Sequence, residues 1–193
     1  GPGGFQPKRA FRFLVNFSAL GGLQFMVKSA KKPSYQLATK EHNILNHVFK
    51  FPGVLKWNDV DVTFIDAVDP NVGSKFYQAL LNAGYVAPVS EGALVTGITK
   101  VQTTDTIGEV SIKQLDGGGI ILPAGADPGE VTGTADSTNI VEEWVLKNAF
   151  LTKVSFGESL DYSSEEIVNV SVTITYDYAE YNSVAGGLPS PSS

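Results

Sequence analysis

The chain has 193 residues, a net charge of −6, 42% hydrophobic residues and 18% charged residues. This length suffices for one domain that buries about 70% of its unfolded surface. Because it contains no cysteine, disulfides, thiolate metal sites and cysteine catalysis are excluded. The apolar runs are too short for a membrane-spanning helix, and the first residues lack the apolar stretch of a secretory signal.

Charge is distributed unevenly along the chain. Residues 1–88 carry a net charge of +5, whereas residues 136–193 carry −7. A basic first half and an acidic last third suit head-to-tail contact between identical subunits. They are equally compatible with one sheet system in which the two parts neutralise each other within a subunit. The residues alone leave both arrangements open.

The first part of the chain predicts a β-hairpin. Residues 1–8 are rich in Gly and Pro and are expected to form a flexible arm before a domain at 9–181. Apolar residues alternate along 9–19, which predicts a strand, and the Gly-Gly pair at 21–22 predicts a tight turn. The returning strand, 23–30, should end before Pro33, because proline cannot continue a central ladder.

The next stretch, 34–46, is polar and weakly patterned, and it is expected to be a long loop. His42 and His47 are five residues apart and have no cysteines or clustered carboxylates nearby, so surface histidines are expected rather than metal ligands. Pro52-Gly53 indicates a turn or kink. Residues 59–65 then alternate, with Val60, Val62 and Phe64 on one side, and predict a strand.

A single helix is predicted over residues 69–83. Asp69 can cap its N-terminus, Pro70 fits its first turn, and Gly84 suits the position after its end. An apolar stripe at helical spacing should cover the sheets; it consists of Phe76, Ala79, Leu80 and Ala83.

Three more strands are predicted in the following region. Two are expected within 94–115 and one at 141–150. The Gly-, Pro- and Thr-rich residues 120–140 are expected to form an inserted loop between them. The last residues, 182–193, are of low complexity and are expected to form a flexible tail.

The strongest strand pattern lies near the C-terminus, where residues 150–178 predict two long strands joined by a polar turn. Residues 168–178 alternate without a break. One face is apolar, and the other carries small polar groups: Asn169, Ser171, Thr173 and Thr175. This polar face fits either the solvated outside of a sandwich or the lining of a wet channel.

No catalytic or metal-binding pattern is present. Residues 117–119 are glycines, but no helix follows them as a nucleotide site requires, and neither GxSxG nor HExxH occurs. The acidic pairs at 142–143 and 165–166 suit solvated charge better than an acid–base pair. We therefore expect no enzyme and no cofactor. The fold class is predicted as mainly β, with two packed antiparallel sheets or a barrel and one covering helix.

Three segments carry a family resemblance. Residues 157–167 (GESLDYSSEEI), followed by the alternating strand and Tyr176-Asp177-Tyr178, resemble the C-terminus of tail tube proteins of contractile-tailed bacteriophages. The kinked strand with Trp57 before 62–64 (VTF), and 144–149 (WVLKNA), also resemble that family. The resemblance covers Arg9 to Tyr178 apart from the insertion at 120–140, which departs from the family pattern.

The resemblance implies a structural virion protein. Its subunits would form hexameric rings that stack into a hollow tube inside a contractile sheath and conduct DNA during ejection, with strands joining edge to edge between subunits. Implied partners are other copies of the chain, the sheath, baseplate and tail-terminator proteins, and DNA in transient, sequence-independent passage. The implied location is the virion tail, assembled in the host cytoplasm without membrane insertion.

Site residues follow as expectations from this resemblance. The polar face with Asn169, Ser171, Thr173 and Thr175 would line the lumen. The loop with Lys40, Glu41 and His42 would contact the adjacent ring.

Two alternative functions stay open. A tube-initiator or baseplate hub protein would share the fold. A β-sandwich binding module, for example for carbohydrate, would show exposed aromatic residues, for which Trp57, Trp144 and Tyr85 are the candidates; burial of the tryptophans would argue against it. A hydrolase comes third, without support from any motif.

Overall fold

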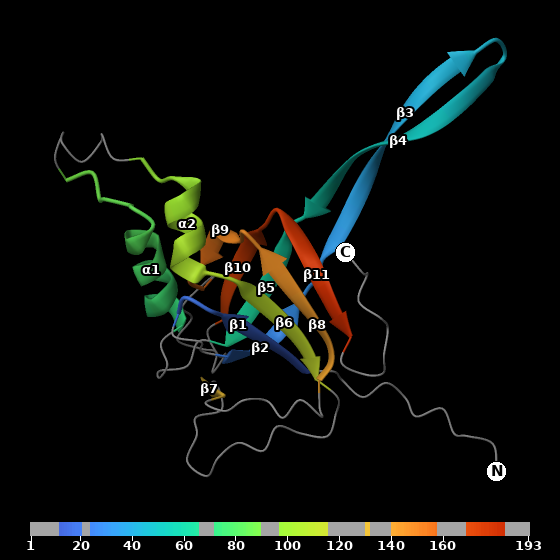
Figure 1. Ribbon diagram of the computed structural model, residues 1–193. Helices are drawn as coiled ribbons and strands as arrows, with labels where there is room; N and C mark the ends of the chain where they lie inside the picture. Colours follow the sequence, from blue (N-terminus) through green and yellow to red (C-terminus); the bar gives the residue numbers. More distant parts are fainter. Residues whose placement is uncertain are drawn as a thin grey trace, which may run out of the picture.

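The computed structural model describes residues 12–20, 24–65, 72–89, 97–115, 130–131, 140–157 and 169–183. Within these ranges the chain is mainly β, with antiparallel strands and two helices, which confirms the predicted fold class and adds a second helix (Figure 1). In chain order the elements are β1 (Arg12–Phe17), β2 (Gln24–Ala30), β3 (Ser34–Ile44), β4 (His47–Asn58), β5 (Val60–Ile65), α1 (Val72–Asn82), α2 (Lys100–Ile107), β6 (Val110–Leu115), β7 (Glu130–Val131), β8 (Ile140–Lys147), β9 (Phe150–Ser155), β10 (Asn169–Thr175) and β11 (Tyr178–Ser183).

Nine of the strands in the described ranges form one sheet, in the order β11-β8-β6-β1-β2-β5-β10-β9, with the short β7 paired to β2. The hairpin predicted around residues 21–22 is confirmed, because β1 and β2 pair antiparallel from Phe13↔Val27 to Asn16↔Gln24. The two C-terminal strands, β9 and β10, also pair antiparallel as predicted. The remaining strands, β3 and β4, pair only with each other in a separate ribbon.

One core occupies the concave side of this sheet. Its buried residues come from β8, β6, β1, β5 and β10, and partly buried Val27 and Ala30 of β2 pack against them, which requires the sheet to curve around a single interior. The alternating side of β5 (Val60, Val62 and Phe64) and the apolar side of β10 are almost fully buried, as the period-2 pattern predicts. Phe17, Phe64 and Phe76 meet at the centre, with ring centroids 5.4–6.0 Å apart.

Helix α1 closes the core. Phe76, Ala79 and Ala83 of the predicted stripe are buried, whereas the fourth member, Leu80, is 38% exposed. It ends as the sequence predicts. Gly84 has φ +100°, its N–H donates to Leu81 O at 3.1 Å, and Tyr85 N–H donates to Leu80 O at 3.3 Å. These two bonds satisfy carbonyls that a helix end leaves open. The proposed cap at Asp69 and Pro70 lies outside the described residues.

Helix α2 corrects a strand prediction made for the first part of residues 94–115. Thr99 begins it with a reciprocal capping box: its side chain accepts from Gln102 N–H, and the Gln102 side chain accepts from Thr99 N–H. Only Ile107 of this helix is buried. Because the helix has no continuous buried face, its apolar residues do not recur at helical spacing, and the sequence gives no periodic signal for it. The second strand of that region is confirmed as β6.

The long C-terminal strand is shorter than predicted. The alternation continues through Tyr176, but β10 ends at Thr175 and the chain turns at Tyr176-Asp177 before β11 pairs with β8. Lys100 and Asn148 hold this break, because both donate hydrogen bonds to the Asp177 carboxylate at 2.7–3.0 Å. These bonds, Lys100 first, lower the pKa of Asp177. Strand β11 runs to Ser183, into the expected tail, whose remainder lies outside the described residues.

Residues 34–46 were predicted to be a loop, but Ser34–Ile44 form strand β3 and only residues 45–46 form a turn. With β4 this strand builds a ribbon that projects away from the body of the molecule (Figure 1). Every residue of β3 is exposed, so no buried face imposes alternation on the sequence. The kink predicted at Pro52-Gly53 is confirmed as a bulge: Gly53 and Val54 lie opposite Ala38 alone. We call residues 34–58 the arm.

Candidate functional site

The polar residues predicted on β10 lie on the convex side of the sheet, away from the core. Cross-strand register places them in rows. Ser29 of β2, Thr63 of β5, Ser171 of β10 and Ser155 of β9 form one row of small hydroxyls. We call the outward side of β2, β5, β10 and β9 the polar face. The sequence predicted its β10 members, whereas the rows arise only from strand pairing.

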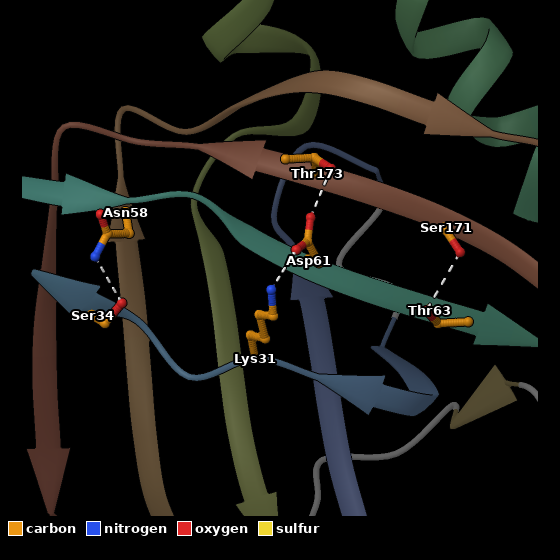
Figure 2. Close-up of polar contacts among 7 residues, drawn as sticks. All are labelled: Lys31, Ser34, Asn58, Asp61, Thr63, Ser171 and Thr173. Atoms are coloured by element: carbon orange, nitrogen blue, oxygen red, sulfur yellow. Dashed lines mark hydrogen bonds and ion pairs between the residues drawn. The ribbon is translucent and has the colours of Figure 1, made fainter.

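Hydrogen bonds connect this face across strands (Figure 2). Thr173 donates from Oγ1 to Asp61 Oδ1 at 2.8 Å, and Lys31 Nζ donates to Asp61 Oδ2 at 3.0 Å. The hydroxyls of Thr63 and Ser171 lie 3.4 Å apart. Thr175 donates to Asp59 Oδ1 at 3.0 Å. Asn169 is half-buried at the start of β10, opposite Ile65.

Lysine and aspartate side chains on the polar face largely offset each other's charge. Lys31 is the main cause that lowers the pKa of Asp61, followed by the hydrogen bond from Thr173. Lys153 lies opposite Thr173 on β9 and lowers that pKa further through its charge. Since the Lys31 and Asp61 side chains are more than half exposed, water screens their pairing, and it contributes little stability. The result is a surface of small polar groups on which Lys31 and Lys153 are offset by Asp59 and Asp61, and the exposed Lys28 of β2 adds one further positive charge.

The predicted ring-contact residues lie on the arm. Lys40, Glu41 and His42 are all exposed on β3, opposite Phe51, Lys50 and Phe49 of β4. The sequence predicted a loop for this segment, which was wrong, because it forms a strand of a projecting ribbon. Its role stays a prediction.

Aromatic side chains hold the base of the arm on the body. Trp57 packs between Tyr35, at a centroid distance of 5.5 Å, and Tyr176, at 6.0 Å. Asn58 Nδ2 donates to Ser34 Oγ at 3.0 Å beside them (Figure 2). Burial raises the pKa of Tyr176 to about 12. The contacts of Trp57 with Tyr35 and Tyr176, which we call the anchor, therefore join the arm to the residue that follows β10.

Both ends of the sheet order are edge strands. Strand β9 pairs with β10 and β11 pairs with β8, and the described residues provide no further strand on either side. Next to β9, an apolar groove of about 270 Å³ lies between α1, α2 and that strand, with Leu80, Ile98 and Phe156 in its lining. Unpaired edges favour pairing with another chain.

Other classes of site find less support. No group of three or more potential metal-binding side chains lies together in the described ranges. No helix among them is long and apolar enough to cross a membrane. The aromatic candidates for a binding module divide: Trp57 and Trp144 are half-buried against the core, and Tyr85 is exposed. The half-burial of both tryptophans argues against a sugar-binding face built on them, whereas other aromatic side chains, among them Tyr35, Phe49 and Phe51 of the arm, are exposed.

Comparison with known proteins identifies the fold. No family model matches the chain, and no curated protein matches its sequence. Solved structures do match: a chain of the anti-feeding prophage (AFP) baseplate has 14% identity and a TM-score of 0.57, and covers 93% of this chain and 98% of its own. The AFP tube-terminating cap has 17% identity and a TM-score of 0.57, over 95% of both chains. The sheath–tube complex of the PVC extracellular contractile injection system in its extended state has 14% identity and a TM-score of 0.53, over 93% of both.

These likenesses, over nearly the whole length of each chain, confirm the tail-tube fold that the sequence motifs suggested. Because the identities are low, the comparison concerns the fold.

Proposed function

We propose that this chain is a structural subunit of the hollow inner tube of a contractile tail, either of a phage or of a related injection particle. Its copies form hexameric rings, the rings stack, and the tube conducts DNA during ejection. The proposal is supported by the fold, which chains of the AFP and PVC assemblies share over nearly their full length. The role is structural and needs no catalytic residue.

The observation that carries this proposal is a curved sheet whose outermost strands, β9 and β11, each have one edge that no other strand of the described residues pairs with. A sheet of this kind exposes backbone donors and acceptors unless it closes with another copy. Pairing or packing β9 of one copy beside β11 of the next gives a head-to-tail contact, which closes into a ring when the rotation fits. Lateral contact between copies then removes both edges together.

The polar face is assigned to the lumen. A DNA conduit needs a surface that does not retain phosphate, because each phosphate neutralised by Lys or Arg adds to affinity. Small hydroxyls, together with lysines offset by aspartates, meet this requirement. Asn169, Ser171, Thr173 and Thr175 are therefore proposed as lumen-facing residues.

The arm is assigned to contact between rings, through Lys40, Glu41 and His42. It extends beyond the body and exposes these three side chains. Further proposed partners are the sheath, the baseplate and the tail terminator. The proposed location is a virion tail or an extracellular particle, assembled in the host cytoplasm.

Negative-stain electron microscopy of the purified, concentrated protein tests the proposal. Rings or hollow tubes are expected, and dispersed monomers at every concentration would contradict self-assembly. The lumen assignment has its own test, in which Ser171→Lys with Thr173→Lys leaves tubes intact but slows cargo passage. Gln78→Lys with Asn82→Lys, on the exposed side of α1, adds the same charge elsewhere and should leave passage unchanged.

A second candidate is a tube initiator, hub or terminator of the same fold. It is favoured by the likeness to chains from a baseplate structure and a tube-terminating cap. Such a protein would form at most single rings alone and would require a tube end for further assembly. Adding preformed tube or baseplate to the monomer distinguishes the two candidates.

A further inference from the structure

The arm exposes far more apolar surface than an isolated β-ribbon tolerates. Apart from Trp57 at its base, the large apolar side chains of the arm are between 43% and 98% exposed, most of them near its end: Ile44, Leu45, Val48, Phe49, Phe51 and Val54. Two-stranded ribbons without a core beneath them are marginally stable in water. A contiguous exposed apolar patch marks an interaction surface. The exposed apolar surface of the arm therefore indicates that another protein surface covers it in the assembled state.

The apolar groups near the tip lie on both sides of the ribbon. Side chains of successive residues in a strand point to opposite faces. Val48 and Phe49 are consecutive and therefore lie on opposite faces at nearly the same distance from the tip. Both side chains are exposed, at 46% and 43%. A ribbon lying on a flat surface would cover only one of them. Covering both requires a cleft.

The tip turn adds an independent observation. Ile44 pairs with His47, so Leu45 and Asn46 form a two-residue turn, and Leu45 has φ +54° and is 98% exposed. A bulky residue in the left-handed region is strained, and its side chain here lies in water. Glycine would suit this position better on both grounds. Leu45 thus combines backbone strain with an apolar side chain in water. This combination indicates that the side chain makes a contact outside the monomer.

Charge indicates that the cleft belongs to other copies of this chain. The arm carries three lysines and one glutamate, whereas the whole chain has a net charge of −6, so the remainder is strongly acidic. Strands of 11 and 12 residues reach roughly 35 Å at about 3.3 Å per residue, far enough to leave their own subunit. The groove of about 270 Å³ beside β9 is too small for a ribbon with side chains on both faces.

We infer that the tip of the arm inserts into the cleft between two neighbouring copies, so that each of its faces contacts a different subunit. The inference rests on the proposed assembly and makes it more specific. Each arm joins three subunits, its own and two others.

The absence of cysteine allows a direct test. Lys40 and Glu41 are exposed neighbours on opposite faces, and Lys40→Cys and Glu41→Cys each accept a benzophenone-maleimide probe. Labelled subunits are assembled with an excess of unlabelled protein and irradiated. Each single variant is expected to give covalent dimers, and the double variant covalent trimers.

The outcomes separate this inference from the proposed function. If tubes form but the double variant gives only dimers, insertion between two copies is contradicted. The same holds if tubes form but one single variant gives no cross-link. In both cases the proposed tube function stands. Absence of both assembly and cross-links overturns the tube itself.

A matched set of variants adds a second readout. Val48→Ser and Phe49→Ser should each raise the concentration needed for tube formation by about tenfold, because each removes one buried apolar contact. Leu45→Gly relieves the backbone strain and should nevertheless raise that concentration. An unchanged or lowered value for Leu45→Gly would show that the tip makes no apolar contact.

Discussion

The body of the molecule and its arm are both built from antiparallel strands, but different partners stabilise them. In the body, one side of each strand faces a core that strands from β8 to β10 and helix α1 share. The arm has no side turned to that core beyond its base, where Trp57 packs against Tyr176. Substitutions in the body should therefore change folding, whereas substitutions in the arm should change assembly.

The largest effect is expected in the core. Phe64→Ala removes a ring that packs against Phe17 and Phe76, and should lower the free energy of unfolding by about 3–5 kcal/mol. Phe51→Ala, the same change on the arm, should alter it by less than about 0.5 kcal/mol. Urea denaturation of both monomers measures the difference, and equal losses would show that the arm belongs to the folded core.

A pair of glycines gives the next comparison. Gly108 has φ +65°, and an added Cβ would overlap the Ser18 side chain and lie 2.9 Å from Ala19 N, so Gly108→Ala should cost about 1–3 kcal/mol in unfolding. At Gly53 in the bulge, an added Cβ would lie 2.9 Å from Ala38 O. Gly53→Ala should shift the arm and weaken tube formation, with the body's unfolding midpoint unchanged. A loss of body stability from the second variant would contradict this division.

A smaller effect is expected where α2 begins. Thr99→Ala removes the capping box with Gln102 and should cost about 1 kcal/mol. Thr104→Ala, within the same helix, keeps the cap and introduces a better helix former, so it should cost less. Thermal unfolding of the two variants compares them, and equal losses would mean that the cap contributes nothing specific.

The last effect appears only at high pH and concerns the contact of Trp57 and Tyr176 between arm and body. Burial raises the pKa of Tyr176 to about 12 in the folded protein, above its ordinary value of about 10. Its contribution is therefore fully present below pH 10 and is lost as the pH rises towards 12. Tyr176→Phe should reduce the fall in unfolding temperature between pH 10 and 12. Tyr178→Phe, at an exposed position, is the control and should leave the fall unchanged.

The sequence predicted most of the body because a buried face leaves a pattern. Period-2 alternation located β5 and β10, whose apolar side chains are buried, and the helical stripe located α1. It missed α2, which buries only Ile107 and depends on a local cap. It also extended β10 through Tyr178, because alternation continues past Thr175 and does not reveal that Lys100 and Asn148 hold a turn at Asp177.

The candidate site divides in the same way. Alternation within one strand identified the polar side chains of Ser171 and Thr173. When one side of a strand is apolar and faces a core, the residues between must point to the other side. Their hydrogen-bond partners, Thr63 and Asp61, come from β5, more than 100 residues away in the chain. Lys31, just after β2, pairs with Asp61 in turn, and only the pairing of β2, β5 and β10 brings these groups together. The arm left no pattern to read, because both of its faces are exposed. Its strands are defined by pairing with each other, and the tertiary structure alone shows that they leave the body.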